Sequence, residues 1–514
     1  MKARIRHQRS HCKRRLQKLL RNAKRRIQHR LGKKQWDEQR RPMFKKQNIH
    51  FDFAAKSTGL RCAGLGVFLL LVQQLGLAKA IDNNLHLLKR HVPYFESDHV
   101  LNLTYNLLVG GKTINDLEQL RNNETYLEVL GAQRIPDPTT SGDFLRRFNA
   151  PDIDALMTAI NDKRRLIWQQ QPEAFFDQAI IEGDGTIVET TGECKQDIEV
   201  AYNGKTGYHP LVLSLANTQE VLFVMNRSGN RPSHEGAAAY FDRAATLCQK
   251  AGFRQIMFRG DTDFSQTAHL DRWHRAGIGF VFGIDSHLTL VSLAKSLPER
   301  EWHSLERPAR YQVATQTRQR PVNVKEEIVR RRGYRNVRLV GEQVAELSYQ
   351  PCACTEEYFV IVLRKQLVWE RHGQVEEEET RYFFYITNRA TWSPAEVVYF
   401  ANDRCNQENL IEQLKNGVRG LRAPVNTLES NWAYMVIGAL VWNMKAWLAL
   451  MQPQLSDKRE LLTMEFRRFL DEVMLLPCQI VRAGRRLIFR LLQWNPWVNM
   501  LCKVSELLRG LQFT

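Results

Sequence analysis

Ala179–Val188, with the sequence AIIEGDGTIV, is the stretch from which the rest of the chain can be interpreted. A short apolar run bounded by glycines favours a buried strand over a helix. A carboxylate in such a strand is costly to desolvate unless a cation or another partner compensates it, and neighbouring glycines let another group approach the backbone closely. Asp184 is therefore a candidate metal ligand, although a strand-end aspartate that caps a turn explains this stretch alone equally well.

A second acidic residue follows a strand within residues 175–290, where strand and helix patterns alternate. Three strand-like runs precede a helix, and strand, helix and strand patterns then complete the region, which predicts an α/β fold. The strand Gln255–Phe258 leads into Gly260 and Asp261, and α/β sheets place ligands at such strand ends. Asp263 is an alternative to Asp261, but it lies farther beyond the end of the strand.

The third acidic candidate lies in residues 393–420, which are expected to form one long helix. The segment SPAE at residues 393–396 has serine at the N-cap, proline at the first helical position and glutamate at the third, which is a strong helix start. Charged residues at spacings of four and seven share one helical face: Arg404, Glu408, Glu412 and Lys415. A ladder of ion pairs on the protein surface is one explanation of this stripe. The very apolar helix that follows instead suggests that residues 393–420 are packed on both flanks, where their charged side chains need partners.

Three carboxylates on two strands and a later helix suit hard divalent cations such as Mg²⁺ or Mn²⁺. Two such ions about 3.5–4 Å apart activate an attacking oxygen and stabilise the leaving one in phosphodiester displacement. Asp184 would then bridge both ions, Asp261 and Glu408 would each complete one, and Arg404 and Lys415 would neutralise substrate phosphate. As a spacing signal alone the three acids are weak, because the chain has 55 acidic residues. Glu412 remains an alternative to Glu408, although the offsets of the two basic residues favour Glu408.

Four segments in combination resemble the DDE transposases of bacterial insertion sequences: IEGDGT at 181–186, NRSGNRPSHEG at 226–236, FRGDTDFS at 258–265 and DRCNQENLIEQLKNG at 403–417. The resemblance covers roughly residues 48–500 and is strongest to the group with a β-strand insertion, the thirteen-eighty family. It implies a ribonuclease-H-like catalytic core that a β-rich insertion interrupts before the acidic helix. It also implies catalytic and metal-binding roles for Asp184, Asp261 and Glu408.

The acidic helix resembles the Tyr–Arg–Glu–Lys signature of this family. Arg404, Glu408 and Lys415 stand at the expected offsets, whereas the tyrosine position falls on Ala401, with Tyr399 just upstream. The activity that the resemblance implies is cut-and-paste DNA transposition: metal-dependent cleavage at the inverted repeats of a transposon, then strand transfer into target DNA, by a homodimer that holds both ends. A stand-alone nuclease on the same core and an inactive, DNA-binding descendant of a transposase are the alternatives.

Two further pairs of residues are candidate DNA contacts. Residues 139–148 place N-cap residues before a short helix that carries Arg146 and Arg147. Helix–turn–helix readers of the major groove have this pattern, as do many ordinary helices. Asn230 and Arg231 lie in a polar loop, where they either grip the DNA backbone or belong to a tight turn.

The formal charge of +19 belongs almost entirely to residues 1–50, which hold 19 Lys and Arg against two acids. Such an extension folds as a helix on nucleic acid or stays disordered. Nine cysteines without zinc-site spacing suit a reducing cytoplasm, so a cytoplasmic, nucleoid-associated bacterial protein is expected. The apolar stretch Ala433–Met451 contains Asn443 and Lys445, which favours a buried core helix over a membrane span.

These patterns predict six segments: a basic extension at 1–47, a helical DNA-binding region at 48–150, a first core segment at 175–287, the β-rich insertion at 288–385, a second core segment with the acidic helix at 386–450, and a C-terminal helical region at 451–514. Within the insertion we expect short β pieces at Asn336–Val340, Tyr358–Leu363 and Leu367–Glu370, and a solvated acidic loop at Glu376–Glu379. Trp302 and Trp369 there either pack or stack on a flipped base. Residues 458–513 are expected to be helical throughout.

Overall fold

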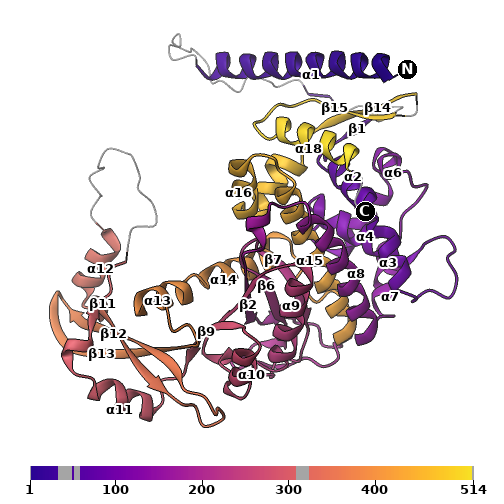
Figure 1. The fold of residues 1–514 in the computed structure, drawn as a ribbon. Helices are drawn as coiled ribbons and strands as arrows, with labels where there is room; N and C mark the ends of the chain where they lie inside the picture. The colour runs from indigo at the N-terminus through magenta and orange to yellow at the C-terminus, as the bar shows by residue number, and fades with distance from the viewer. Residues whose placement is uncertain (1, 33–48, 51–57, 308–322, 485, 512–514) are drawn as a thin grey trace. The chain divides into compact units, whose positions relative to one another are not determined.

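The structure is a computed structural model that describes residues 2–32, 49–50, 58–307, 323–484 and 486–511 (Figure 1). The chain divides into two compact units. The helical unit comprises residues 1–170, 194–196 and 413–514, and the sheet unit comprises residues 171–193 and 197–412.

One mixed sheet organises the sheet unit. Its strands, in spatial order, are β10 (His303–Ser304), β11 (Asn336–Tyr349), β12 (Tyr358–Arg371), β13 (Gln374–Thr387), β9 (Gly279–Ile284), β8 (Gln255–Gly260), β2 (Gln178–Gly185), β6 (Leu211–Leu215) and β7 (Glu220–Met225). β2, β6 and β7 are antiparallel neighbours, whereas β8 and β9 run parallel to β2. Three antiparallel strands followed by two parallel ones, in this spatial order, make the ribonuclease-H-like core, so the predicted fold class is confirmed.

The core strands are apolar because helices cover them. Every residue of β6 and of β9 is buried, as expected for strands without a solvent face. The long helix α9 (Ala237–Ala251) packs on β2, β6 and β8. Gly183 permits that approach, since a Cβ there would lie 2.9 Å from the ring of Phe241 on α9. The glycine beside Asp184 thus serves close helix packing.

Shorter elements complete the sheet unit. They are η2 (Glu173–Phe176), β3 (Val188–Glu189), β4 (Glu199–Val200), β5 (Thr206–Tyr208), η3 (Thr262–Phe264), η4 (Thr267–His269), α10 (Leu270–Arg275), α11 (Leu288–Ser296), η5 (Glu299–Glu301) and α12 (Val324–Arg332). β3, β5 and β4 form a small separate sheet.

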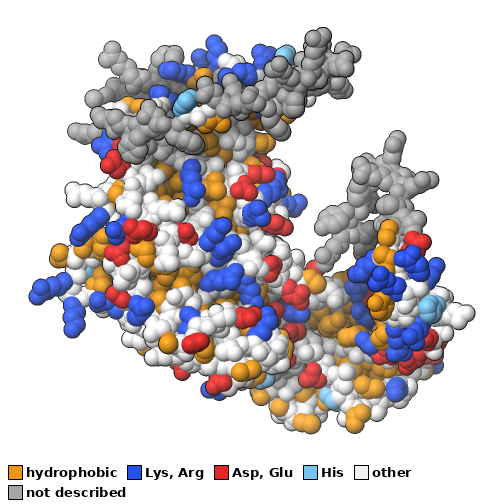
Figure 2. All heavy atoms as spheres, turned by 180° about the vertical axis from the view of Figure 1, so that it is seen from behind, with side chains coloured by type: hydrophobic (Ala, Val, Ile, Leu, Met, Phe, Trp, Pro, Cys, Tyr) orange, Lys and Arg blue, Asp and Glu red, His pale blue; other side chains and the backbone are white. Residues whose placement is uncertain are grey.

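The insertion extends the core sheet with long strands, so the prediction of short β pieces is wrong. β11, β12 and β13 each have 14 residues, and β13 pairs with β9 through Thr387 and Val281. The acidic run Glu376–Glu379 lies in β13 and not in a loop. Pairing with β12 explains this, because Glu377, Glu378 and Glu379 lie opposite Trp369, Val368 and Leu367. Arg335 and Arg371 form ion pairs with this run, at Glu377 and Glu376. Figure 2 shows the Lys and Arg side chains gathered with acidic ones at this end of the insertion.

Residues 393–420 do not form the single helix that the pattern predicts. They form α13 (Pro394–Asn402), α14 (Cys405–Glu412) and the π-helical segment η6 (Gln413–Gly417). A partly buried contact explains the first break: Arg259 donates from Nη1 to the carbonyl of Phe400, 2.7 Å away. That carbonyl would accept from the amide of Arg404 in a continuous α-helix, and the Arg404 amide donates instead to Ala401.

The helical unit is built around α15 (Leu428–Leu450). The other helices are α1 (Lys2–Leu31), α2 (Leu65–Leu75), α3 (Leu77–Asn84), α4 (Glu96–Leu108), η1 (Ile114–Asp116), α5 (Leu117–Arg121), α6 (Glu124–Leu130), α7 (Pro138–Leu145), α8 (Ala150–Trp168), α16 (Leu455–Thr463), α17 (Phe466–Phe469), η7 (Leu470–Met474) and α18 (Val498–Gly510). Helix α15 is long and apolar enough to cross a membrane, but its apolar window is entirely buried. The predicted core helix is confirmed, with Lys445 donating to the carbonyl of Leu462 at 3.1 Å.

A three-stranded sheet interrupts the C-terminal helices, so the prediction of helix throughout residues 458–513 is wrong. β14 (Cys478–Ala483) and β15 (Arg486–Leu491) form a hairpin, and β1 (Gly59–Leu60) pairs with β14. Gly484 at the turn adopts a φ of +61°, which favours glycine. In the basic extension α1 is a helix, and residues 33–47 lie outside the described residues.

Candidate active site

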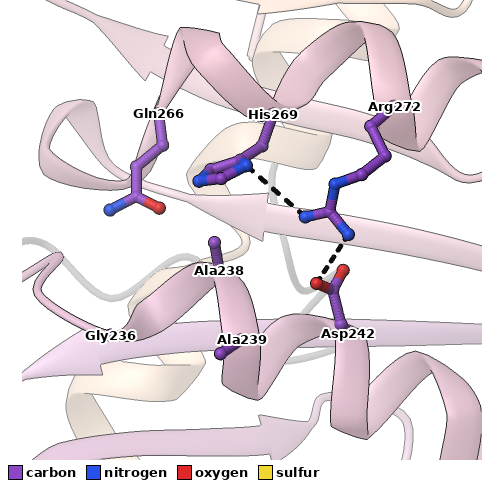
Figure 3. Close-up of a pocket in the computed structure, with 7 residues that line it drawn as sticks. All are labelled: Gly236, Ala238, Ala239, Asp242, Gln266, His269 and Arg272. Atoms are coloured by element: carbon purple, nitrogen blue, oxygen red, sulfur yellow. Dashed lines mark hydrogen bonds and ion pairs between the residues drawn. The ribbon is translucent and has the colours of Figure 1, made fainter.

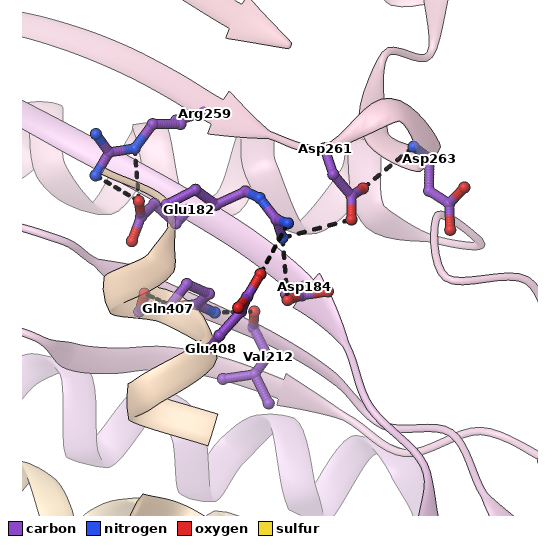
Figure 4. Close-up of polar contacts among 10 residues, drawn as sticks. Glu182, Asp184, Val212, Arg259, Asp261, Asp263, Gln407 and Glu408 are labelled. Atoms are coloured by element: carbon purple, nitrogen blue, oxygen red, sulfur yellow. Dashed lines mark hydrogen bonds and ion pairs between the residues drawn. The ribbon is translucent and has the colours of Figure 1, made fainter. Parts of the chain in front are cut away.

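Three carboxylates of the sheet unit meet at one guanidinium (Figure 4). Arg404 Nη1 lies 3.3 Å from Asp184 Oδ2 and 3.4 Å from Asp261 Oδ2. Its Nη2 lies 3.0 Å from Glu408 Oε1. The fold therefore brings together the three acids and the arginine that the sequence singled out.

Two parallel strands and a buried ion pair position the aspartates. β2 and β8 are neighbours with Glu182 opposite Arg259. Asp184 lies two residues farther along β2, and Asp261 lies directly after the end of β8, as the N-cap of η3. Arg259 Nε donates to Glu182 Oε1 at 2.5 Å, and both side chains are almost fully buried. Since a buried charge without its partner is costly, this pair holds the two strand ends in register beneath Asp184 and Asp261.

Gln407 anchors the helix that carries Glu408, and the sequence analysis missed it. Its buried side chain donates from Nε2 to the carbonyl of Val212 at 3.0 Å and accepts from the hydroxyl of Ser214. Val212 lies opposite Asp184 in the pairing of β2 and β6, so this anchor fixes α14 against the strand beside Asp184. A signal was present: Gln407 lies at helical spacing with Leu410, Ile411 and Leu414, and a glutamine on an apolar face indicates a buried polar contact.

The electrostatics of the cluster favour additional positive charge. Burial raises the pKa of Asp184 to about 7, with the carboxylates of Asp261 and Glu408 acting in the same direction and Arg404 opposing them. Burial likewise raises the pKa of Asp261, again against Arg404. One arginine does not offset desolvation and mutual repulsion, so a further cation would stabilise the ionised cluster.

The ion pairs of Arg404 distinguish the two acidic alternatives. Asp263 lies in η3, where its amide donates to Asp261 Oδ1 at 3.1 Å, while its side chain is outside the Arg404 cluster. Glu412 is the last residue of α14, one turn beyond Glu408, and is not among the three carboxylates that contact Arg404. The geometry thus favours Asp261 and Glu408.

The loop after β7 is organised by Arg227, a second residue that the sequence analysis missed. Its buried guanidinium donates from Nη1 to the carbonyls of Pro232, Ser233 and Glu235 at 2.8–3.0 Å. Asn230 and Arg231 are exposed on this loop, and Arg231 lies 3.6 Å from Glu235. A tight turn therefore describes the loop, and DNA contact by its two exposed residues stays a prediction.

The remaining candidate DNA contacts lie in the helical unit. Helix α7 ends at Leu145, so Arg146 and Arg147 follow it instead of lying within it. Arg146 is engaged within the protein, with Nε 2.8 Å from Asn426 Oδ1 and Nη1 2.8 Å from Asp143. Lys415 lies in the π-helical segment η6. DNA contact by these residues also stays a prediction.

The two tryptophans of the insertion pack within the protein. The guanidinium of Arg364 lies 4.0 Å above the ring of the buried Trp302. Trp369 donates from Nε1 to Glu379 at 2.8 Å, and Arg335 stacks on its ring at 4.3 Å. These contacts favour packing over stacking on a base.

A pocket lies at the start of α9 (Figure 3), and no residue of the carboxylate cluster lines it. Its lining residues are Gly236, Ala238, Ala239, Asp242, Gln266, His269 and Arg272. Its two charged side chains compensate each other, since Arg272 Nη1 lies 2.7 Å from Asp242 Oδ2. The pocket therefore offers a ligand no net charge.

The carboxylate cluster has the chemistry of a divalent metal site but is held around an arginine. Across the described part of the chain, no three His, Cys, Asp or Glu side chains are close enough to hold one metal ion. Asp184, Asp261 and Glu408 nevertheless direct oxygens to a single cationic group, and oxygen donors of this kind suit Mg²⁺ or Mn²⁺. The three side chains thus offer the oxygen donors that such ions take, but in this arrangement Arg404 lies between them.

Comparison with known proteins gives one family and one solved structure of note. The family model described as "Transposase DDE domain group 1" matches residues 43–513. A solved structure of the piggyBac transposase synaptic complex with hairpin DNA has 11% sequence identity and a TM-score of 0.33, and the match covers 80% of this chain and 84% of that one. Comparison with proteins of curated function gives no match.

Proposed function

The chain belongs to the family of transposases with the group 1 DDE domain, and from this premise we propose that it cleaves DNA at the inverted repeats of a transposon and joins the freed ends to target DNA. The convergence of Asp184, Asp261 and Glu408 on Arg404 is the single observation that best supports the proposal. These residues belong to three separate segments, and the ribonuclease-H-like core brings them to one point.

The three carboxylates would hold two Mg²⁺ or Mn²⁺ ions. When bound, such ions activate the attacking oxygen and stabilise the leaving oxygen of a phosphodiester. The side chains themselves supply negative charge at fixed positions: Asp184 lies in β2, Asp261 directly after β8, and Glu408 in the anchored helix α14. The buried pair Glu182–Arg259 and the anchor Gln407 keep β2, β8 and α14 in place.

Basic residues would bind the DNA backbone. Arg404, Lys415 and Arg231 are proposed to contact phosphates, together with Asn230, Arg146 and Arg147. Double-stranded DNA of both the transposon ends and the target is the proposed partner. Both ends must be held at once, so we expect a homodimer on DNA. Affinity for DNA should fall steeply with salt, because phosphate contacts release counterions.

The experiment that tests the proposal is a cleavage assay on the DNA that flanks the gene itself, with Mg²⁺ or Mn²⁺. The intact chain is compared with Asp184→Asn, Asp261→Asn and Glu408→Gln, and with the matched controls Asp263→Asn and Glu412→Gln. Nicks at an inverted repeat are expected from the intact chain and both controls but not from the three cluster variants, which should still bind DNA.

Other outcomes of the same assay reject the proposal in distinct ways. Cleavage that is never followed by joining to target DNA would indicate a stand-alone nuclease. Saturable DNA binding without metal-dependent cleavage would indicate an inactive descendant of a transposase. Full cleavage by Asp184→Asn would show that the cluster is not the active site.

A further inference from the structure

Arg404 lies where the three carboxylates would share a cation. It contacts one oxygen of each, at 3.3, 3.4 and 3.0 Å. With every group ionised, one positive and three negative charges leave the cluster at a formal charge of −2. A single guanidinium therefore holds the acids together without neutralising them.

Arg404 lies at a break in the helix and closer to solvent than the buried Arg259. Arg404 lies in the break between α13 and α14, where the Phe400 carbonyl accepts from Arg259 and not from the Arg404 amide. The Arg404 side chain is 22% exposed, whereas that of Arg259 is 4% exposed. Moving Arg259 would unpair a buried charge. The partly exposed Arg404 can exchange its ion pairs for solvent at a lower cost.

We propose that Arg404 is a displaceable counter-ion, which occupies the carboxylate site until divalent cations bind there. In the metal-free protein it neutralises part of the charge on Asp184, Asp261 and Glu408, and it must leave them before they can hold divalent cations. The inference rests on the proposed function, because it takes these three residues as metal ligands. The released guanidinium is then available to a DNA phosphate. Metal and DNA binding thereby favour each other through one side chain, as linkage requires.

The test is a titration of the full chain, free of DNA, with Mn²⁺, followed by the electron paramagnetic resonance signal of free Mn²⁺. Arg404→Gln removes the internal competitor and should bind Mn²⁺ about tenfold more tightly than the intact chain, which is the scale of a partly exposed, multiply bonded ion pair. Arg272→Gln is the matched control, since Arg272 pairs with Asp242 outside the cluster. It should bind Mn²⁺ as the intact chain does. Equal or weaker binding by Arg404→Gln would overturn the inference.

Thermal unfolding supplies a second readout. In EDTA, Arg404→Gln should melt below the intact chain because its three carboxylates repel one another without a counter-ion. Saturating Mn²⁺ should close that gap, since the intact chain no longer uses the arginine there. A gap of the same size in EDTA and in Mn²⁺ would show that Arg404 stays on the carboxylates, against the inference.

Asp184→Asn separates failure of this inference from failure of the proposed function. If Asp184→Asn abolishes the Mn²⁺ binding of the intact chain but Arg404→Gln does not strengthen it, only the counter-ion role is wrong. If neither the intact chain nor Arg404→Gln binds Mn²⁺ better than Asp184→Asn does, the cluster is not a metal site, and both proposals fall.

Discussion

Gln407→Met tests whether the anchor of α14 positions Glu408. In the intact chain Gln407 is 1% exposed, donates to the carbonyl of Val212 at 3.0 Å and accepts from Ser214. Methionine has a similar length but can neither donate to Val212 nor accept from the Ser214 hydroxyl. The variant keeps the volume of the side chain and removes its polar contacts.

The expected cost follows from the buried groups that lose partners. Leaving one buried polar group unsatisfied costs about 1–3 kcal/mol, so Gln407→Met should lower the free energy of unfolding by about 2–3 kcal/mol. The next residue is Glu408, and a misplacement of about 1 Å at a reacting group costs on the order of a hundredfold in rate. We therefore expect cleavage of the transposon end to fall about a hundredfold while DNA binding is retained.

Ser214→Ala is the matched control, because it removes one of these contacts and leaves the bond from Gln407 to Val212 intact. It should cost about 1 kcal/mol of stability and leave cleavage within severalfold of the intact chain. The measurements are denaturant unfolding and single-turnover cleavage of end DNA. If Gln407→Met loses stability but cleaves at the rate of Ser214→Ala, the anchor stabilises the fold without positioning Glu408, and the reasoning is refuted.

Three further changes test other regions of the structure. Burial lowers the pKa of Lys445 from 10.5 to about 7, so the unfolded chain binds more protons than the folded one between these pH values, and stability should rise with pH across that window. Lys445→Met should abolish the rise and stabilise most at about pH 6, as urea unfolding at about pH 6 and about pH 9.5 will show. Gly438→Ala should destabilise by about 3 kcal/mol, because its Cβ would lie 2.2 Å from the Cα of Gly420; an unchanged melting temperature would contradict that close packing. Glu182→Leu and Arg259→Met should each cost about 3–5 kcal/mol, and the double variant should cost much less than their sum in a double-mutant cycle.

Local sequence patterns predicted the strands and helices whose own apolar spacing and capping residues favour that structure. The apolar run before Asp184, the strand before Asp261 and the helix start at Ser393 are strand and helix where the sequence indicated them. The buried helix α15 also follows from its composition. In these segments the spacing of apolar residues and the capping residues agree with the tertiary fold, so short windows suffice.

Tertiary contacts decided the elements that the sequence analysis misjudged. The acidic helix breaks at Arg404 because Arg259, which is remote in sequence, donates a hydrogen bond to the carbonyl of Phe400. The C-terminal hairpin of β14 and β15 replaces expected helix, and one reason is that β1, at residues 59–60, pairs with it. Neither Arg259 nor β1 lies within the short stretch of sequence over which the spacing of apolar residues predicts a helix.

The sequence by itself indicated the candidate acids, because they stand at strand ends and on a charged helix face and lie in the segments that resemble the DDE transposases, and their catalytic role remains a prediction. Only the tertiary structure decided that Asp184, Asp261 and Glu408 converge on Arg404 and that Gln407 and Glu182–Arg259 hold them there. The physical reason is that burial and ion pairing depend on which distant segments meet. The residues of one segment do not specify the partners that desolvate or neutralise its charges.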